Sequence, residues 1–264
     1  MKTIILDPNI FTWEDFDNIR GVAKNLNVTQ VYTVSKDYGP TLIFGGLNFV
    51  IAYGKLYQPG FFGDFKRFHC SVYYPYFGKY LLNDRYFFIP GNELSRRFTE
   101  LQNLFGGSLF VRPDSCFKPF TGTVLNNQQE ADVLCKSINP EGLIVVAAEK
   151  TAKEIGDEYR FFVYEDRIIA GSRYIQDGKI NELEYSKCEL GQKAFNYALR
   201  IAEENFVYAV PAEAYVLDIS CNFKNEPRLI EINHFNTSGW YDINKIEMIN
   251  CIEKILEKES YDIS

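Results

Sequence analysis

The stretch "EAYVLDISCNFKNEPRLIEIN", residues 213–233, decides the fold. It holds two apolar runs, each interrupted by one carboxylate, Asp218 in the first and Glu231 in the second, with the turn-forming residues "FKNEP" between them. Because the connection is short, we expect an antiparallel hairpin in which the two carboxylates meet on one face of a sheet. Side chains alternate along a strand, so Asn233 is expected on the same face as Glu231.

Three oxygen-bearing side chains on one strand pair predict a site for a hard cation. Magnesium accepts one or two carboxylates and completes its shell with substrate phosphates, so Asp218, Glu231 and Asn233 are candidate magnesium ligands. A structural alternative stays open, in which Asp218 pairs with a core arginine and Glu231 lies at a solvated sheet edge. The reason is that a buried carboxylate is costly unless it is paired or metal-bound.

Phosphate binding also needs cations, and basic residues stand at suitable places upstream. They are Arg112 at the end of "LFVR", Lys118 in the loop after it, Arg160 in "EYRFFV" and Arg173 in "GSRY". An arginine at a strand end is usually a surface or salt-bridge residue, so the prediction depends on their joint arrangement.

The first third of the chain has an α/β pattern. A strand at Thr3–Leu6, a helix entered at Thr12 and a strand "QVYTVS" at 30–35 predict a β-α-β unit with a parallel pair. The Gly-, Pro- and aromatic-rich segment 39–90 shows few helical periods, and we expect most of its aromatic side chains in the core. A domain boundary is expected near residue 88.

The rest of the chain reads as a mixed, largely antiparallel unit. The segments expected there are a helix at 92–105 with Asn92 as its cap, a strand at 108–113, a helix beginning near Asn127, a strand at 142–148, a hairpin over 158–180 with turns at Glu165-Asp166 and Asp177-Gly178, a helix at 190–206, the strand pair quoted above and a final helix from Asp242.

Composition excludes several classes of function. A net charge of -7 and a pI near 5.1 give no basic footprint for broad nucleic-acid or anionic-membrane binding. The six cysteines lack C-x-x-C spacing, which argues against zinc and disulfides. With only His69 and His234, a histidine-based triad is disfavoured, and each histidine is expected in packing or at the surface. Without a signal-peptide or membrane-spanning apolar run, we expect a soluble, cytoplasmic protein.

The order of these segments resembles that of the ATP-grasp ligases. The chain is most similar to the small phage and bacterial clade in which arginine replaces the ATP-site lysine, and more distantly to the ribosomal-protein glutamate-tail ligases. The resemblance implies an α/β (α+β) ATP-grasp fold. An N-terminal α/β pre-ATP-grasp domain at 1–88 would precede an ATP-grasp domain at 89–264, whose subdomains 89–148 and 149–264 would enclose the nucleotide.

The resemblance also implies a role for each candidate residue. Asp218, Glu231 and Asn233 would bind Mg²⁺. Arg112 and Lys118 would bind the ATP phosphates, Arg160 would stabilise the transferred γ-phosphate and Arg173 would face the acceptor. Ala147, Ala148 and Glu149 would form the hinge against adenine, Glu149 or Glu158 would contact the ribose, and Arg97 would be a further cation on the ATP side.

The implied activity is that of an ATP-dependent carboxylate-amine ligase, with ATP and Mg²⁺ as cofactors. The acceptor would be a small molecule, peptide or protein carrying a carboxylate, which is phosphorylated and then attacked by an amine. Such chemistry requires positioning and charge neutralisation more than histidine. A phosphotransferase on the same fold and a non-catalytic nucleotide-binding or interaction module remain alternatives, and a hydrolase using paired Asp and Glu is a weaker one.

Two features near the site stay undecided in the sequence. The phosphate loop, "DSCFKPFTGTV", contains a single glycine where the superfamily has several, which favours the non-catalytic alternative and predicts a stiffer loop in which Lys118 supplies charge. After Asn233, the residues Thr237, Ser238 and Gly239 are expected to form a helix-capping turn, with a contact to the acceptor as the alternative.

Overall fold

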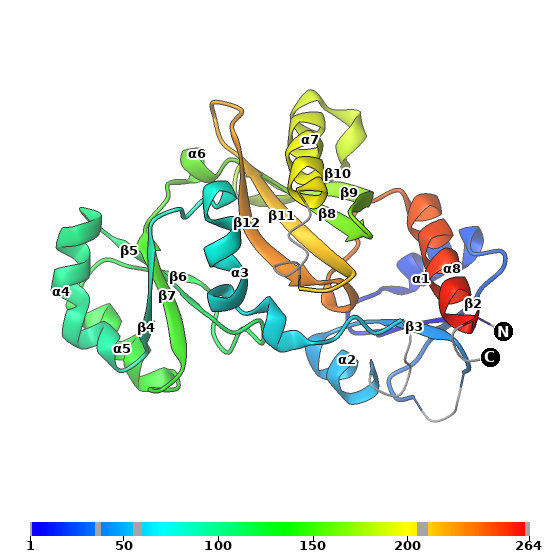
Figure 1. The fold of residues 1–264 in the computed structure, drawn as a ribbon, viewed down its shortest axis with the longest axis horizontal. Helices are drawn as coiled ribbons and strands as arrows, with labels where there is room; N and C mark the ends of the chain where they lie inside the picture. The colour runs from blue at the N-terminus through cyan, green and yellow to red at the C-terminus, as the bar shows by residue number, and fades with distance from the viewer. Residues whose placement is uncertain (1, 35–37, 55–59, 205–210, 262–264) are drawn as a thin grey trace.

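The computed structural model describes residues 2–34, 38–54, 60–204 and 211–261, and their strands form three separate sheets. Figure 1 shows the three units side by side, with the five-stranded sheet between the other two. This arrangement is the mixed α/β architecture that the sequence predicts.

The N-terminal sheet is parallel, with the strand order β2-β1-β3. Its elements are β1 (Thr3–Leu6), α1 (Trp13–Val22), β2 (Asn27–Gln30), β3 (Thr41–Phe44) and α2 (Leu47–Tyr53). Thr12 caps α1, where its hydroxyl accepts from the Asp15 amide and the Asp15 carboxylate accepts in return. The predicted β-α-β unit is therefore present, but its second strand, β2, ends at Gln30, the first residue of "QVYTVS". Residues 31–34 are not part of a strand, and residue 35 lies outside the described residues.

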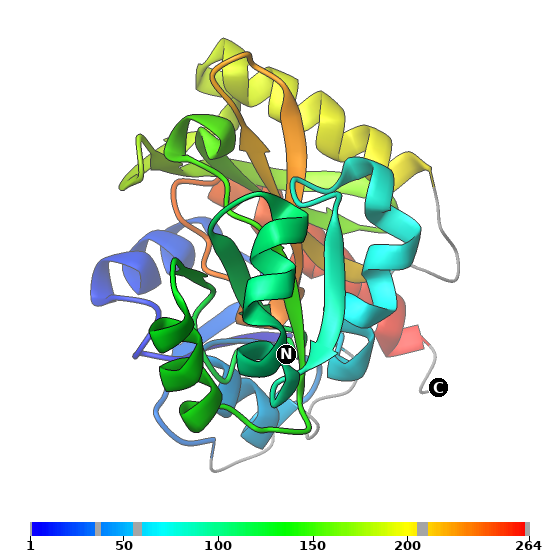
Figure 2. The same ribbon diagram turned by 90° about the vertical axis from the view of Figure 1, so that its left-hand side faces the viewer.

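The second sheet is antiparallel, with the order β4-β7-β5-β6. Its elements are β4 (Tyr86–Pro90), α4 (Glu93–Phe105), β5 (Leu109–Pro113), β6 (Thr123–Leu125), α5 (Gln128–Ser137) and β7 (Leu143–Ala148). The helices α4 and α5 cover one face of this sheet, as Figure 2 shows with the two helices in front. The boundary expected at residue 88 falls inside β4. Asn92 precedes α4, but its side chain forms no capping hydrogen bond.

The third sheet has the order β10-β9-β8-β11-β12, with every neighbouring pair antiparallel. Its elements, with the helices around them, are α6 (Ala152–Ile155), β8 (Asp157–Tyr164), β9 (Arg167–Gln176), β10 (Lys179–Glu184), η4 (Tyr185–Lys187), α7 (Glu189–Glu203), β11 (Ala214–Cys221), β12 (Pro227–His234), η5 (Phe235–Thr237) and α8 (Lys245–Tyr261). Both turns predicted in the hairpin are present. Their residues 165, 166, 177 and 178 have positive φ, as two-residue hairpin turns require.

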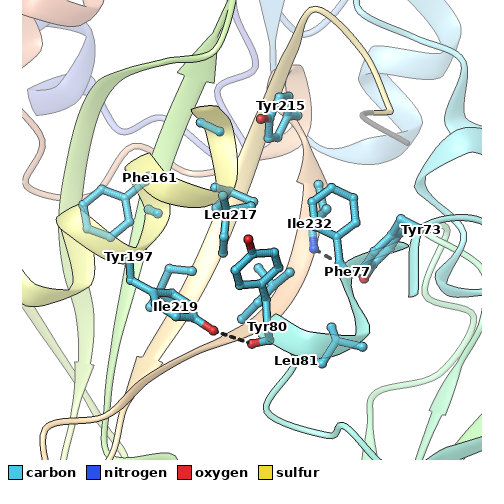
Figure 3. Packing of buried hydrophobic residues seen from close by; sticks show 14 of the residues in the cluster. Tyr73, Phe77, Tyr80, Leu81, Phe161, Tyr197, Tyr215, Leu217, Ile219 and Ile232 are labelled. Atoms are coloured by element: carbon cyan, nitrogen blue, oxygen red, sulfur yellow. Dashed lines mark hydrogen bonds between the residues drawn. The ribbon is translucent and has the colours of Figure 1, made fainter. Parts of the chain in front are cut away.

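One face of the five-stranded sheet is buried under α7 and the aromatic segment 65–80, which forms η2 (Phe65–Phe68), α3 (Cys70–Phe77) and η3 (Gly78–Tyr80). Figure 3 shows Tyr73, Phe77 and Tyr80 packed against sheet residues such as Leu217. The Tyr197 hydroxyl donates to the Tyr80 carbonyl at 3.0 Å, which ties α7 to this segment. The aromatic residues are therefore mainly core, as expected.

The segment 39–90, in which the sequence shows few helical periods, contains the helices α2 and α3. The buried residues of α3 are Cys70, Tyr73, Tyr74 and Phe77, which is the i, i+3, i+4, i+7 spacing of a helix face. Pro75 concealed the pattern, since proline ordinarily interrupts a helix.

The opposite face of the five-stranded sheet covers the N-terminal unit. Its residues Phe162 and Val216 share a core with Ile4 and Phe44 from the parallel sheet and with Ile252 from α8. Figure 1 shows α8 returning to lie beside α1 and the parallel sheet, and Lys2 bonds Glu257 at 2.7 Å. The chain ends thus fasten the N-terminal unit to the sheet face that carries Asp218.

Candidate active site

Asp218 and Glu231 face each other on adjacent strands. They are paired in the β11–β12 register, and Asn233 lies two residues beyond Glu231. The Asn233 Nδ2 donates to Asp218 Oδ2 at 2.8 Å and to Glu231 Oε1 at 2.9 Å. The three predicted metal ligands therefore meet at one point, as alternation and the short turn indicate.

A β-bulge beside this point was not foreseen. Asp218 pairs with Glu231 but Ile219 pairs with Leu229, so Ile230 is the extra residue in β12. The bulge lets Leu229 and Ile232 enter the same hydrophobic cluster although they are three positions apart. Glu231 is thereby aimed into the site without removing an apolar side chain from the core.

Arg160 binds Asp218 with two hydrogen bonds. β8 places it directly beside Asp218, and its Nε and Nη2 donate to the two carboxylate oxygens at 2.8 and 2.7 Å. The Asp218 side chain is 1% exposed. Burial raises the pKa of Asp218, and Arg160 opposes this rise. The structural alternative for Asp218, a pair with a core arginine, is therefore present in the structure.

Two tyrosines that the sequence did not single out complete the surroundings of Arg160. The rings of Tyr174 and Tyr241 lie 5.2 and 5.3 Å from its guanidinium carbon, and the two rings stack on each other. Each contact falls within cation–π range, so the rings stabilise the guanidinium that is paired with the carboxylate. Tyr241 has φ of 52°, a left-handed backbone that no sequence motif announces.

Glu231 binds two cations from a different sheet. Arg112 at the end of β5 donates to Glu231 Oε2, and Lys118 Nζ lies 2.8 Å from Oε1. Burial disfavours the charged carboxylate, but Arg112 and Lys118 outweigh it and hold the pKa of Glu231 well below its ordinary value. The ion pairs thus connect the four-stranded sheet to the five-stranded sheet across the site.

The loop that carries Lys118 is held down by aromatic contacts. Phe117 packs on Phe65 at 5.4 Å between ring centroids, and Phe65 stacks on His234 at 4.3 Å. The Cys116 thiol also bonds the Phe65 carbonyl at 3.0 Å. These contacts anchor the loop to the aromatic segment and, through Phe65, to β12.

The residues expected around adenine and ribose lie between the two sheets. Ala147 and Ala148 end β7, and the Glu149 amide extends the ladder by donating to the Ser108 carbonyl at 3.1 Å. The chain then crosses to β8, where Glu158 accepts from the Tyr174 hydroxyl at 2.6 Å. Burial raises the pKa of Glu158, and the Tyr174 hydrogen bond opposes the shift.

Arg173 is not brought to this site. A two-residue turn without irregularity would pair Glu158 with Arg173, but the register shifts by one between Phe162 and Val163 and pairs Arg173 with Tyr159. Arg173 therefore points to the α7 face, where it bonds Asn181 and lies 3.6 Å from Asp157. A further candidate, Arg97, lies on α4 and pairs with Glu93 at 2.8 Å.

Both histidines are held in structural contacts. Burial lowers the pKa of His234 to about 3, so its ring is neutral, and its Nδ1 accepts from the Asn236 amide at 3.3 Å. His69 Nδ1 lies 3.5 Å from Asp114 Oδ2. All six cysteines are free thiols, as the sequence predicts.

A cavity of about 710 Å³ opens beside the charged cluster. Its basic wall contains Lys118 and Arg160, with Asn233 next to them. Thr237, Ser238 and Gly239 also line it, and they do not cap α8, because Ser238 bonds the His234 carbonyl while Asn244 accepts from the first turn of that helix. The turn after β12 therefore belongs to the cavity wall.

The charges at the site suit an anion that brings a divalent cation. Arg112, Lys118 and Arg160 carry three positive charges against the two negative charges of Asp218 and Glu231. Two carboxylates and one amide fit Mg²⁺, which takes its other ligands from phosphate and water. Within the described residues, no three His, Cys, Asp or Glu side chains gather into a group that could hold a metal.

A four-stranded and a five-stranded antiparallel sheet joined by ion pairs at a carboxylate pair are the arrangement expected of an ATP-grasp protein. The chain belongs to the ATP-grasp domain family of R2K clade family 2, whose family model matches residues 95–251, more than half of the chain. No curated protein matches the chain in sequence.

Solved structures share the fold. D-alanyl-alanine synthetase A from Vibrio cholerae O1 biovar eltor is 13% identical, with a TM-score of 0.62 and coverage of 97% of this chain and 98% of that chain. D-cycloserine synthetase DcsG is 9% identical, with a TM-score of 0.57 and coverage of 97% and 100%. The ATP-grasp ligase PsnB, solved with the precursor peptide PsnA2 and AMPPNP, is 14% identical, with a TM-score of 0.54 and coverage of 97% and 97%. At these identities the likeness concerns the fold.

In the described part of the chain, no helix is long and apolar enough to span a membrane.

Proposed function

We propose that the protein is an ATP-dependent carboxylate-amine ligase. The observation that carries the proposal is the pair of facing carboxylates, Asp218 and Glu231, gripped by cations from two sheets beside a cavity of about 710 Å³. This arrangement supplies what phosphoryl transfer to a carboxylate requires: positive charge at the transferred group, a shared metal shell and an adjoining space for the acceptor. Membership of the ATP-grasp family and the ligase names of the solved relatives support it.

The proposal divides the chain by function. The unit up to residue 88 would form one wall of the acceptor cavity, 89–148 would cover the nucleotide phosphates through Arg112 and Lys118, and 149–264 would carry the carboxylates. Asp218, Glu231 and Asn233 would hold Mg²⁺, which neutralises phosphate charge when bound. The Asn233 amide would turn to present its oxygen, because in this structure its nitrogen faces both carboxylates.

Each cation has a defined task in the proposed reaction. Arg112 and Lys118 exchange Glu231 for the ATP phosphates, and Arg160, already held in place by Asp218, stabilises charge on the γ-phosphate as it moves to the acceptor carboxylate. The product is an acyl phosphate and ADP. An amine then attacks the acyl carbon, phosphate leaves, and an amide forms.

The neighbouring residues keep the nucleotide in register. The backbone of Ala147 to Glu149 would contact adenine, and Glu158 or Glu149 the ribose. Arg173 keeps its proposed role toward the acceptor only if it acts from the α7 face, where Asp157 and Asn181 already bind it. The central site therefore works with Arg160 alone at the reacting phosphate.

A non-catalytic nucleotide-binding module is the second candidate. It is favoured by the ion pairs that already satisfy Asp218 and Glu231, because a site closed in this way can be stable without a metal. Turnover separates the two candidates, and the products separate a ligase from a phosphotransferase.

The test is incubation with ATP, Mg²⁺ and pools of amino acids, peptides and cell extract. ADP release is measured and new products are sought by mass spectrometry. We expect ADP and an amide product, and a loss of at least a hundredfold in Glu231→Gln. The matched control is Glu189→Gln, whose side chain is 85% exposed at the start of α7. ADP release that is equal in wild type and Glu231→Gln, or absent with every pool, contradicts the proposal.

A further inference from the structure

The cavity beside Arg160 has charges of opposite sign at two places on its wall. Lys118 and Arg160 form a basic end next to the carboxylate pair, and Asp15 and Glu182 contribute carboxylates elsewhere on the wall. Asp15 comes from the first turn of α1, and Glu182 comes from β10, the edge strand. The two acidic side chains therefore reach the cavity from different units of the fold.

In the part of the chain that the structure describes, the two carboxylates of the acidic end, Asp15 and Glu182, form no ion pair with a cation. Among the described residues, Glu182 forms no hydrogen bond or ion pair, and Asp15 accepts only from Thr12 in the capping box. Burial and the nearby carboxylates of Asp15 and Asp242 raise the pKa of Glu182, and the cationic Lys245 opposes the rise. Because the carboxylates outnumber this one lysine, the acidic end of the cavity favours a cationic ligand group.

A second, independent feature of the wall also lacks a partner. Trp240 lines the cavity, is 4% exposed and is held by edge contacts with Phe11 and Phe44, yet its Nε1 has no hydrogen-bond partner in the described chain. A buried indole N–H is ordinarily paired. A ligand that brings an acceptor atom, such as a peptide carbonyl oxygen, to the edge of this indole would satisfy it.

The sheet sets the distance between the two ends. Arg160 is on β8 and Glu182 is on β10, with β9 between them. Two inter-strand spacings amount to about 10 Å. The amine and carboxylate of a single α-amino acid are separated by one carbon atom and do not bridge this distance, whereas an extended chain covers about 3.3–3.6 Å per residue, so about three residues do.

We propose that the cavity binds a short peptide whose free amine lies at Asp15 and Glu182 and whose carboxylate lies at Lys118 and Arg160. This inference rests on the proposed function, because it identifies the peptide as the substrate whose carboxylate is activated. Phe65 and Tyr241 on the cavity wall would contact its side chains. The charges select against peptides blocked at either end.

The experiment measures binding with the full chain, Mg²⁺ and AMPPNP. Defined mixtures of amino acids, dipeptides and tripeptides are dialysed against the protein in free, N-acetylated and C-amidated forms, and the retained compounds are quantified by mass spectrometry. We expect the free peptides to be retained, with each blocking group and the reduction to one residue weakening binding at least tenfold. Equal retention of N-acetylated peptides, equal retention of single amino acids or retention of no peptide overturns the proposal.

Variants locate the effect. Glu182→Gln is expected to weaken free peptides about tenfold while changing N-acetylated peptides less than twofold, and Glu189→Gln is expected to change neither. Equal effects of Glu182→Gln on both forms would remove Glu182 from the site. ADP release in parallel samples with ATP separates this inference from the proposed ligase activity. Selective peptide binding without ADP release refutes only the ligase, and ADP release driven by a blocked acceptor refutes only the peptide assignment.

Discussion

The bidentate pair between Arg160 and Asp218 gives a sharp test of how the site is held together. Replacing Asp218 by Asn keeps the size of the side chain and removes its charge, while the Arg160 side chain stays 11% exposed. Breaking a buried ion pair from one side costs about 3–5 kcal/mol, since the remaining charge is left without its partner. The rings of Tyr174 and Tyr241 still contact the guanidinium, so we expect the lower end, about 3 kcal/mol.

The assay is thermal and urea unfolding followed by circular dichroism and by fluorescence of the buried Trp240. A loss of about 3 kcal/mol corresponds to a fall in Tm of about 6–12 °C for a chain of this size. The double variant Asp218→Leu with Arg160→Met removes both charges and is expected to unfold within about 1 kcal/mol of the wild type. Neither variant should release ADP. An Asp218→Asn protein as stable as the wild type, or a double variant less stable than the single one, would refute this account of the pair.

Three further predictions concern other parts of the chain. His234 has a pKa of about 3 when folded and 6.5 ordinarily, so unfolding takes up a proton at acidic pH, and the free energy of unfolding falls as pH drops below 6.5, by about 2 kcal/mol at pH 5. Urea unfolding at pH 7 and at pH 5 should show this loss in the wild type and not in His234→Gln. Gly156→Ala would place a Cβ 1.8 Å from the Cys221 carbonyl oxygen at φ of 72° and should lower the free energy of unfolding by about 2–3 kcal/mol. Gly106→Ala, at φ of 78° with nothing within 4 Å, should lower it by about 1–2 kcal/mol, and equal Tm values for the two variants would contradict the close approach at Gly156. Lys118→Gly removes an ion pair that is 49% exposed on the lysine side and also relieves a φ of 45°, so stability should change by less than about 1 kcal/mol while ATP affinity, measured by calorimetry, weakens about tenfold; unchanged affinity would exclude Lys118 from the phosphates.

Much of the site was accessible to prediction, because it depends on local rules. Strand alternation and a short turn brought Asp218, Glu231 and Asn233 together, and the residues at 165–166 and 177–178 gave both hairpin turns. The aromatic segment was harder. The helix α3 has a regular buried face, but Pro75 and the surrounding aromatic residues hid its period.

Bulges explain where the prediction of side-chain direction failed. One extra residue in β9 shifts the register and turns Arg173 toward α7, so Arg160 is the arginine of this sheet that meets Asp218. Another in β12 aims Glu231 into the site. Neither shift is marked by a glycine or proline at that place. Alternation counted along the sequence therefore predicts the wrong sheet face for the side chains beyond the bulge in β9.

The sequence by itself determined many of the elements, the facing carboxylates and the resemblance to the ATP-grasp family, because bond geometry makes strand alternation and turn formation local properties. Only the tertiary structure decided which partners these residues meet. Arg112 and Glu231 are 119 positions apart, and their pairing depends on how two sheets lie against each other. The cavity likewise combines α1, the Lys118 loop, β10 and the turn after β12, because distant segments share a surface only after packing has brought them together.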